Sequence, residues 1–139
     1  MYSRLFALLS VVLLCSCVME HEQEVPLITR PVSLSRTQVA VIKGELIKTT
    51  KNAVSEWFGK MSAATDGTHI YVCGMFKADT STGDDAGGGF YFGTLTEGNG
   101  GAYLFSPVVY SYSAGYGRTQ EGIMRICSLH GTQIEFPLE

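Results

Sequence analysis

The chain has 139 residues and a net charge of −3, and 17% of its side chains are charged while 45% are hydrophobic. A chain of this length holds one domain, and its apolar content allows a packed core and excludes a disordered protein. The basic residues are scattered without forming a cluster, which excludes the charge pattern of a nucleic-acid-binding protein. We therefore expect a single folded domain and no nucleic acid among its partners.

The first residues have the pattern of a secretory signal peptide. One arginine, Arg4, precedes an apolar run from Leu5 to Leu14 that only Ser10 interrupts. At about ten residues, this run is too short to cross the ~30 Å hydrocarbon layer of a membrane as a helix. We predict that residues 1–16 form an export signal that is absent from the mature protein.

The end of the apolar run, Leu14-Cys15-Ser16-Cys17, resembles a bacterial lipobox. In that motif a small residue directly precedes the cysteine that becomes lipidated, and an aliphatic residue stands two positions further upstream. Lipidation of Cys15 would place the bulky Leu14 directly before it, which fits poorly. The resemblance implies that Cys17 is the acylated first residue of a mature lipoprotein. A secreted protein whose cysteines happen to lie near the cleavage site is the alternative.

The same resemblance suggests a location. Val18, which follows Cys17, is not the aspartate associated with retention of lipoproteins in the inner membrane. We therefore expect the protein on the outer membrane of a Gram-negative cell, facing the periplasm. Its contact with the membrane would be the acyl chains on Cys17, palmitate among them.

The segment after the lipobox is predicted to be a tether. Residues 17–33 contain Glu20, Glu22 and Glu24 together with two prolines, and they show no sustained periodicity. Acidic residues and proline disfavour both helix propagation and strand pairing. The segment should hold the domain away from the lipid surface.

Residues 34–139 are predicted to form one α+β domain. Its first element is a helix that begins after Ser35, which forms a possible capping box with Gln38. The apolar residues on one face of this helix are Val39, Ile42, Leu46 and Ile47. Four segments rich in aromatic and β-branched residues follow: EWFGKMSAA, HIYVCGMFKA, GFYFGTL and AYLFSPVVYSY. They predict an antiparallel sheet of about four strands.

The last predicted element is a helix from about Thr119 to His130. Its apolar face consists of Ile123, Ile126 and Cys127, and Gly131 stands where a glycine ends many helices. The apolar face should pack on the sheet. The predicted fold is therefore a small antiparallel sheet of about four strands packed by an N-terminal and a C-terminal helix.

With Cys15 removed and Cys17 lipidated, Cys73 and Cys127 are the remaining thiols. One lies on a predicted strand and the other on the buried face of the last helix. Two facing cysteines form a disulfide in an oxidising compartment, and this bond would fasten the helix to the sheet. Free buried thiols are an alternative. A redox or metal role is another, although the usual CxxC spacing and further ligands are missing.

Catalytic chemistry is not indicated by the sequence. It contains no nucleophile elbow, phosphate loop, zinc-ligand pair or dinucleotide motif, so we expect neither an enzyme nor a bound metal or other cofactor. His69 begins a predicted strand after a turn, and His130 lies in the last helical turn. Both are interpreted as surface or capping groups.

A recognition surface is a further possibility. The segment DTSTGDDAGGG, residues 79–89, offers three carboxylates, Asp79, Asp84 and Asp85, which are the kind of ligand that Ca²⁺ takes. The segment lacks the order of an EF-hand, which favours a hairpin connection. Tyr112 and Tyr116 lie near another glycine-containing loop and could join the aspartates in binding a partner, although packing within the sheet is the competing interpretation.

Several segments resemble a group of small, functionally uncharacterised exported proteins of proteobacteria. These proteins share a helix, a KDPxSAxF-like segment, a VCGxVNxKNxxGGYxG-like strand and loop, and a late cysteine. The matching residues are Lys51, Ser55, Phe58, Cys73, Gly74, Gly83 and Gly87. Departures occur at Asn52, Ala53, Glu56, Asp84 and Asp85. The resemblance implies the same fold and the disulfide, and it implies no known activity.

The sequence thus predicts an exported, membrane-anchored lipoprotein that is a binding or structural component of the cell envelope. One alternative is a periplasmic inhibitor of lysozyme-like enzymes, because Ser113-Ala114-Gly115-Tyr116 is similar to a Ser-Gly-x-x-Tyr loop of such lipoproteins. Another is a phage- or plasmid-encoded exclusion lipoprotein, which would have the same size. Apart from the membrane, the expected partner is an envelope protein.

Overall fold

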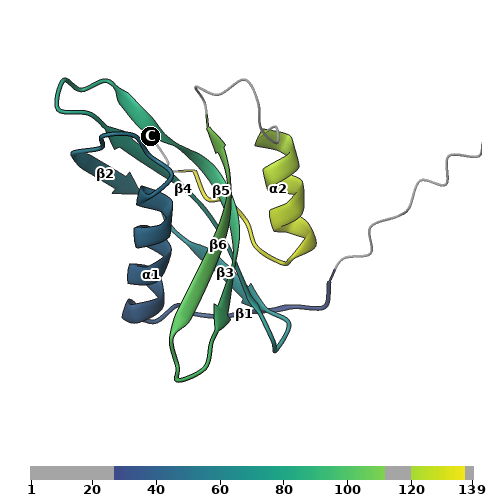
Figure 1. Ribbon diagram of the computed structural model, residues 1–139. Coiled ribbons are helices and arrows are strands. Elements are labelled where there is room, and N and C mark those ends of the chain that lie inside the picture. Colours follow the sequence, from purple (N-terminus) through teal and green to yellow (C-terminus); the bar gives the residue numbers. More distant parts are fainter. Residues whose placement is uncertain (1–26, 112–119, 137–139) are drawn as a thin grey trace, which may run out of the picture.

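The computed structural model describes residues 27–111 and 120–136 (Figure 1). Within these ranges the elements are β1 (Arg30–Pro31), α1 (Arg36–Ile47), β2 (Ser55–Phe58), β3 (Ser62–Thr65), β4 (Ile70–Asp79), β5 (Asp85–Glu97), β6 (Tyr103–Ser111) and α2 (Gln120–Leu129). The predicted class, an antiparallel sheet with two helices, is confirmed. The sheet has six strands in the described part of the chain, so the predicted number of about four is wrong.

One additional strand results from a break in the predicted strand EWFGKMSAA. Its two halves, β2 and β3, both pair with β4. Pairing stops at Phe58 opposite Phe76 and resumes at Ser62 opposite Cys73. Residues 59–61 therefore lie opposite two residues of β4, and one extra residue on one strand is the definition of a β-bulge. The bulge divides the predicted strand and changes the direction of its side chains.

The other additional strand, β1, lies within the segment predicted to be a tether. Arg30 pairs with Thr65 and Pro31 pairs with Ala64. A proline is tolerated here because β1 is an edge strand, where a missing N–H need not remove a bond of the ladder. The domain therefore begins before residue 34, and the prediction of a tether over all of residues 17–33 is wrong for its last part.

The two helices cover opposite faces of the sheet (Figure 1). Because side chains alternate along a strand, neighbouring residues of β4 such as Val72 and Cys73 point into different layers. The buried cluster on the α1 side consists of Ile42, Leu46, Ala63, Val72, Phe76, Tyr91, Leu95 and Phe105. The buried cluster on the α2 side consists of Cys73, Phe90, Ile123 and Cys127. The domain thus has three layers, with the sheet in the middle.

Both helices have the end signals that the sequence predicts. The Ser35 hydroxyl accepts a hydrogen bond from the Gln38 N–H at 3.2 Å, and the Gln38 side chain accepts one from the Ser35 N–H at 2.8 Å. This reciprocal pair is the predicted capping box of α1. After α2, Gly131 has a φ of +70°, which glycine adopts without steric cost. The Thr29 side chain packs against this glycine and leaves no room for a Cβ atom.

A disulfide joins Cys73 of β4 to Cys127 of α2, as predicted. Their Cα atoms are 6.1 Å apart, and both residues are buried in the α2 layer. The hydroxyl of Thr132, which is also buried, donates to the Cys73 sulfur at 2.9 Å and so ties the segment after α2 to the same point. The bond fastens the shorter helix to the centre of the sheet.

Candidate functional site

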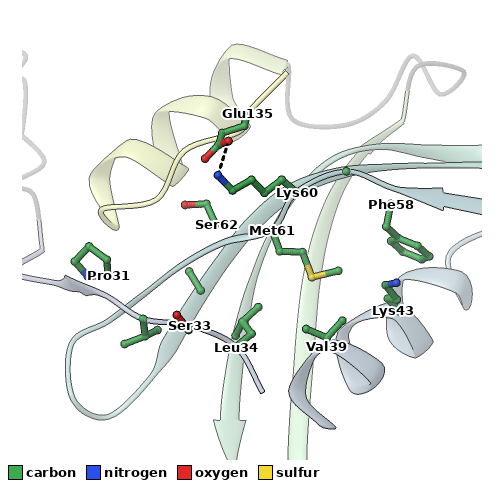
Figure 2. A pocket seen from close by; sticks show the side chains of 13 residues that line it. Pro31, Ser33, Leu34, Val39, Lys43, Phe58, Lys60, Met61, Ser62 and Glu135 are labelled. Carbon is green, nitrogen blue, oxygen red and sulfur yellow. Dashed lines mark hydrogen bonds and ion pairs between the residues drawn. The ribbon is translucent and has the colours of Figure 1, made fainter. Parts of the chain in front are cut away.

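An open groove of about 570 Å³ lies at the sheet edge where the bulge interrupts the pairing (Figure 2). Its volume is within the range of roughly 300–1,000 Å³ that ligand sites of proteins occupy. Four parts of the chain line it: residues 31–34, Val39 and Lys43 of α1, residues 58–63, and Glu135. The groove therefore forms only when the N-terminal strand, α1 and the bulge have come together.

The floor of the groove is the outer edge of residues 58–61, along which no further strand is paired in the described part of the chain. The last backbone contact between the N-terminal segment and β3 is the bond from the Val32 N–H to the Ala63 carbonyl, at 3.0 Å. Beyond Val32 the chain turns away toward α1. Among the described residues, β2 pairs with β4 alone, and the N–H groups of Lys60 and Met61 have no hydrogen-bond partner. Backbone groups at this edge are thus available to a bound molecule.

Apolar side chains form the walls of the groove. Leu34, Phe58 and Met61 are partly buried and pack against the core of the α1 layer. The Phe58 ring is stacked on Phe76 with 5.8 Å between the ring centroids, which fixes its position. Figure 2 shows the Met61 side chain extending toward Leu34 and Val39. A ligand in the groove would contact side chains that the core already holds in place.

Two lysines give the groove a positive rim. The Lys43 ammonium lies 4.9 Å from the centroid of the Phe58 ring, a cation–π contact. The Lys60 ammonium is 2.8 Å from a carboxylate oxygen of Glu135 (Figure 2), and this exposed pair contributes about 0–1 kcal/mol. Within the part of the chain that the structure describes, Lys43 has no carboxylate partner. The groove therefore favours a ligand that carries a negative charge.

A second polar cluster lies at the turn between β3 and β4. The Tyr71 hydroxyl donates to the Asp66 carboxylate at 2.7 Å. This bond, together with the backbone N–H groups of His69 and Thr68, holds the pKa of the Asp66 carboxyl well below its usual range. Burial, and secondly the bond to Asp66, raise the pKa of Tyr71 to about 12. Asp66 stays charged and Tyr71 neutral near neutral pH, so this pair stabilises the turn and exchanges no proton.

The predicted capping role of His130 agrees with the structure. Its Nδ1 lies 2.8 Å from the Ile126 carbonyl oxygen and can donate to it, in addition to the backbone N–H of His130, which donates to the same oxygen at 3.2 Å. Its ring also packs on Tyr71 and Phe92, with 4.4 and 4.8 Å between ring centroids. The side chain of His69 lies 3.5 Å from Asp66 in the turn. Both histidines thus serve the local structure.

Of the residues predicted as a recognition surface, the three aspartates lie in the β4–β5 hairpin, where Asp79 is opposite Asp85 in the strand pairing. Asp79 ends β4, where its Oδ1 is buried and 3.1 Å from the Lys77 ammonium without the geometry of a hydrogen bond. Asp84 accepts a hydrogen bond from the Thr82 hydroxyl within the turn. Asp85 is the first residue of β5. The residues that lie outside the described ranges are Tyr112, Tyr116, Cys17 and the segment Ser113–Tyr116.

The connection predicted over residues 79–89 is shorter than expected. The turn itself comprises residues 80–84, and Gly87, Gly88 and Gly89 belong to β5, where they pair with β4. In the described residues, no group of three or more histidine, cysteine, aspartate or glutamate side chains is arranged to hold a metal ion. The aspartates of this segment therefore serve the hairpin in the described structure.

The sequence pattern does not predict the groove, because Lys43 lies within an ordinary predicted helix and Phe58 and Met61 lie within an ordinary predicted strand. One signal is present: Gly59 interrupts an otherwise regular strand pattern, and a single glycine in such a pattern indicates a bulge. Bulges occur often beside functional sites, where they redirect a side chain.

Comparison of the chain with protein families, with characterised proteins and with solved structures finds no match. The helices in the described residues are too short or too polar to span a membrane. The groove is therefore assigned as the candidate site on its geometry and charge.

Proposed function

We propose that the protein is an exported lipoprotein, anchored in the outer membrane by acyl chains on Cys17, and that its domain binds another envelope component in the groove. One observation carries the binding function: within the described residues, apolar walls, backbone N–H groups without a partner and a lysine without a carboxylate partner meet in one open groove. Sites with this combination recognise partners by shape, hydrogen bonds and charge. The proposed role is binding, without enzymatic activity.

The anchor is supported by the lipobox-like sequence at Cys17, and it would place the domain close to the membrane. Leu27, the first described residue, donates its N–H to the Leu129 carbonyl at the end of α2, at 3.0 Å. From Cys17 to Leu27 the chain can span at most roughly 35 Å, because an extended chain advances about 3.5 Å per residue. An anchor at Cys17 would therefore keep the end of α2 near the lipid surface. The disulfide agrees with what the resemblance to small exported proteobacterial proteins implies, and we propose that the protein belongs with them.

Photo-crosslinking in intact Gram-negative cells tests this function. The photoreactive residue p-benzoylphenylalanine is introduced in place of Met61 in the groove. As a control it replaces Leu104, which is 65% exposed and lies on the α2 side of the sheet. We expect a discrete adduct from position 61, recovered in the membrane fraction, and no such adduct from position 104. The same adduct from both positions, or none from position 61, would contradict a binding role of the groove.

The anchor is tested in the same cells with Cys17→Ser. This substitution removes the acylation site and leaves the described domain unchanged, so the protein should leave the membrane fraction while its thermal unfolding stays the same. Retention of the variant in the membrane fraction would argue against acylation at Cys17. The matched control is Ser10→Ala in the predicted signal, which should leave the location unchanged.

A further inference from the structure

We infer that the ligand of the groove is an extended acidic peptide segment of a partner protein, which adds as a strand to the free edge of β2 and places a carboxylate at Lys43. The inference rests on the proposed function, because it names the class of ligand for the same groove. It follows from three features of this sheet edge: its backbone, its alternating side chains and its charge.

The backbone groups at the edge of β2 can pair with the backbone of an added peptide strand. β2 and β3 lie in line along the same side of β4, and β1 covers the outer side of β3 only. The N-terminal segment follows β3 as far as Val32 and then turns away. A peptide paired with β2 would lie in line with β1, beyond that point. Its N–H and C=O groups would meet strand groups that have no partner strand in the described part of the chain. An acyl chain in the groove could satisfy none of them.

The side chains of β2 can contact an added strand on both faces of the sheet. Phe58 points into the groove on the α1 side, where it stacks on Phe76. Trp57, its neighbour, points to the other face and is 47% exposed. Alternate side chains of an added strand would contact Phe58 on one face and Trp57 on the other. Tryptophan is enriched among the residues that carry binding energy at interfaces.

The positive charge of Lys43 favours a peptide that carries a carboxylate. Lys60 is already paired with Glu135, whereas Lys43 contacts the Phe58 ring and no carboxylate among the described residues. A carboxylate on the groove side of the added strand would lie close to Lys43 and to the ring beneath it. The observations thus favour an acidic, extended segment over a neutral one.

The opposite edge of the sheet is less suited to strand addition. The edge strand there, β6, contains Pro107, which has no N–H group. A proline in an edge strand is a common means of preventing further pairing. β1, the other edge strand, has two residues and one of them is Pro31. β2 contains no proline, so among the described strands its edge is the best suited to a peptide.

The test uses the purified mature protein with its disulfide intact. The probe is an array of capped eight-residue peptides in which threonine alternates with valine, isoleucine, leucine or phenylalanine and one position carries aspartate. Trp57 is the single tryptophan of the chain, so its fluorescence reports directly on the edge of β2. We expect array members to bind and to shift the Trp57 emission to shorter wavelength, because the added strand removes water from the ring.

Two controls separate strand addition from other modes of binding. Alternate N–H groups of an added strand point toward β2, and the others point away from it. N-methylation of the residues whose N–H groups point toward β2 should weaken binding at least tenfold, and N-methylation of the other residues should not. Lys43→Gln should weaken the aspartate peptide about tenfold and leave its asparagine analogue unaffected, in keeping with the usual size of a charged hydrogen bond. Lys48→Gln, a matched change at the end of the same helix, should leave both affinities unchanged.

Several outcomes would overturn the inference. Absence of binding by every array member would do so, as would equal binding of peptides N-methylated at either set of residues. If oleate binds in a Lys43-dependent manner while the peptides do not, the ligand is an anionic amphiphile. A dimer in sedimentation that Trp57→Ser dissociates would make a second copy of this chain the occupant. In each case a crosslinked adduct from position 61 would still support the groove as a binding site, so the two proposals fail separately.

Discussion

Replacing both Cys73 and Cys127 by alanine is expected to lower the free energy of unfolding by about 4 kcal/mol. The disulfide closes a loop between residues 54 positions apart, and cross-linking a loop of this length restricts the unfolded chain strongly. The loss would be a large part of the roughly 5–15 kcal/mol that stabilises most domains. Urea-induced unfolding of the two proteins, followed by circular dichroism, measures the difference.

Reduction provides the matched control for this prediction. A reductant should destabilise the native protein by a similar amount and should leave the double-alanine variant unchanged. Hydrogen exchange should increase most in α2, because the bond joins this helix to β4. Equal urea midpoints for the native and double-alanine proteins would show that the bond contributes nothing to stability.

Gly88→Ala is expected to lower the free energy of unfolding by about 3 kcal/mol or more, because two costs add. Gly88 has a φ of +115°, a conformation that residues with a Cβ atom rarely adopt. A Cβ atom there would also lie 2.5 Å from the Phe76 carbonyl oxygen and 2.9 Å from the Lys77 Cα atom. These are backbone atoms of β4 and cannot rotate away, so the hairpin itself must shift.

Gly83→Ala is the matched control in the same hairpin. Gly83 also has a positive φ, +81°, but a Cβ atom there would meet nothing within 4 Å. The substitution therefore carries the conformational cost alone, about 1–2 kcal/mol. Thermal and urea unfolding of the two variants measures the difference between them. Equal losses would mean that the close approach of β5 to β4 at Gly88 is not a constraint.

The parts of the fold that the sequence predicts are those with local signals. The capping box at Ser35 and Gln38 and the apolar face of the last helix are visible within a few residues. The run HIYVCGMFKA, rich in aromatic and β-branched residues, likewise identifies β4 as a strand. The disulfide follows because one cysteine lies on each of two elements that must pack together.

The parts that the sequence does not predict depend on contacts between distant residues. β1 has two residues, both exposed, so no periodicity marks it. It becomes a strand because Arg30 and Pro31 meet Thr65 and Ala64, more than 30 positions later in the chain. The groove requires the same contacts, since it brings Lys43, Phe58 and Glu135 together from separate segments. Patterns within single segments therefore indicate the layers, whereas the groove depends on contacts between segments that are far apart in the chain.

The central claim, an exported and lipid-anchored domain held by one disulfide, is tested most directly by an intact mass. The full chain is expressed in a Gram-negative host, recovered from the membrane fraction, and alkylated before and after reduction. We predict a mature protein that begins at an acylated Cys17 and gains two alkyl groups, on Cys73 and Cys127, only after reduction. An unacylated chain whose thiols react before reduction would contradict both the anchor and the disulfide.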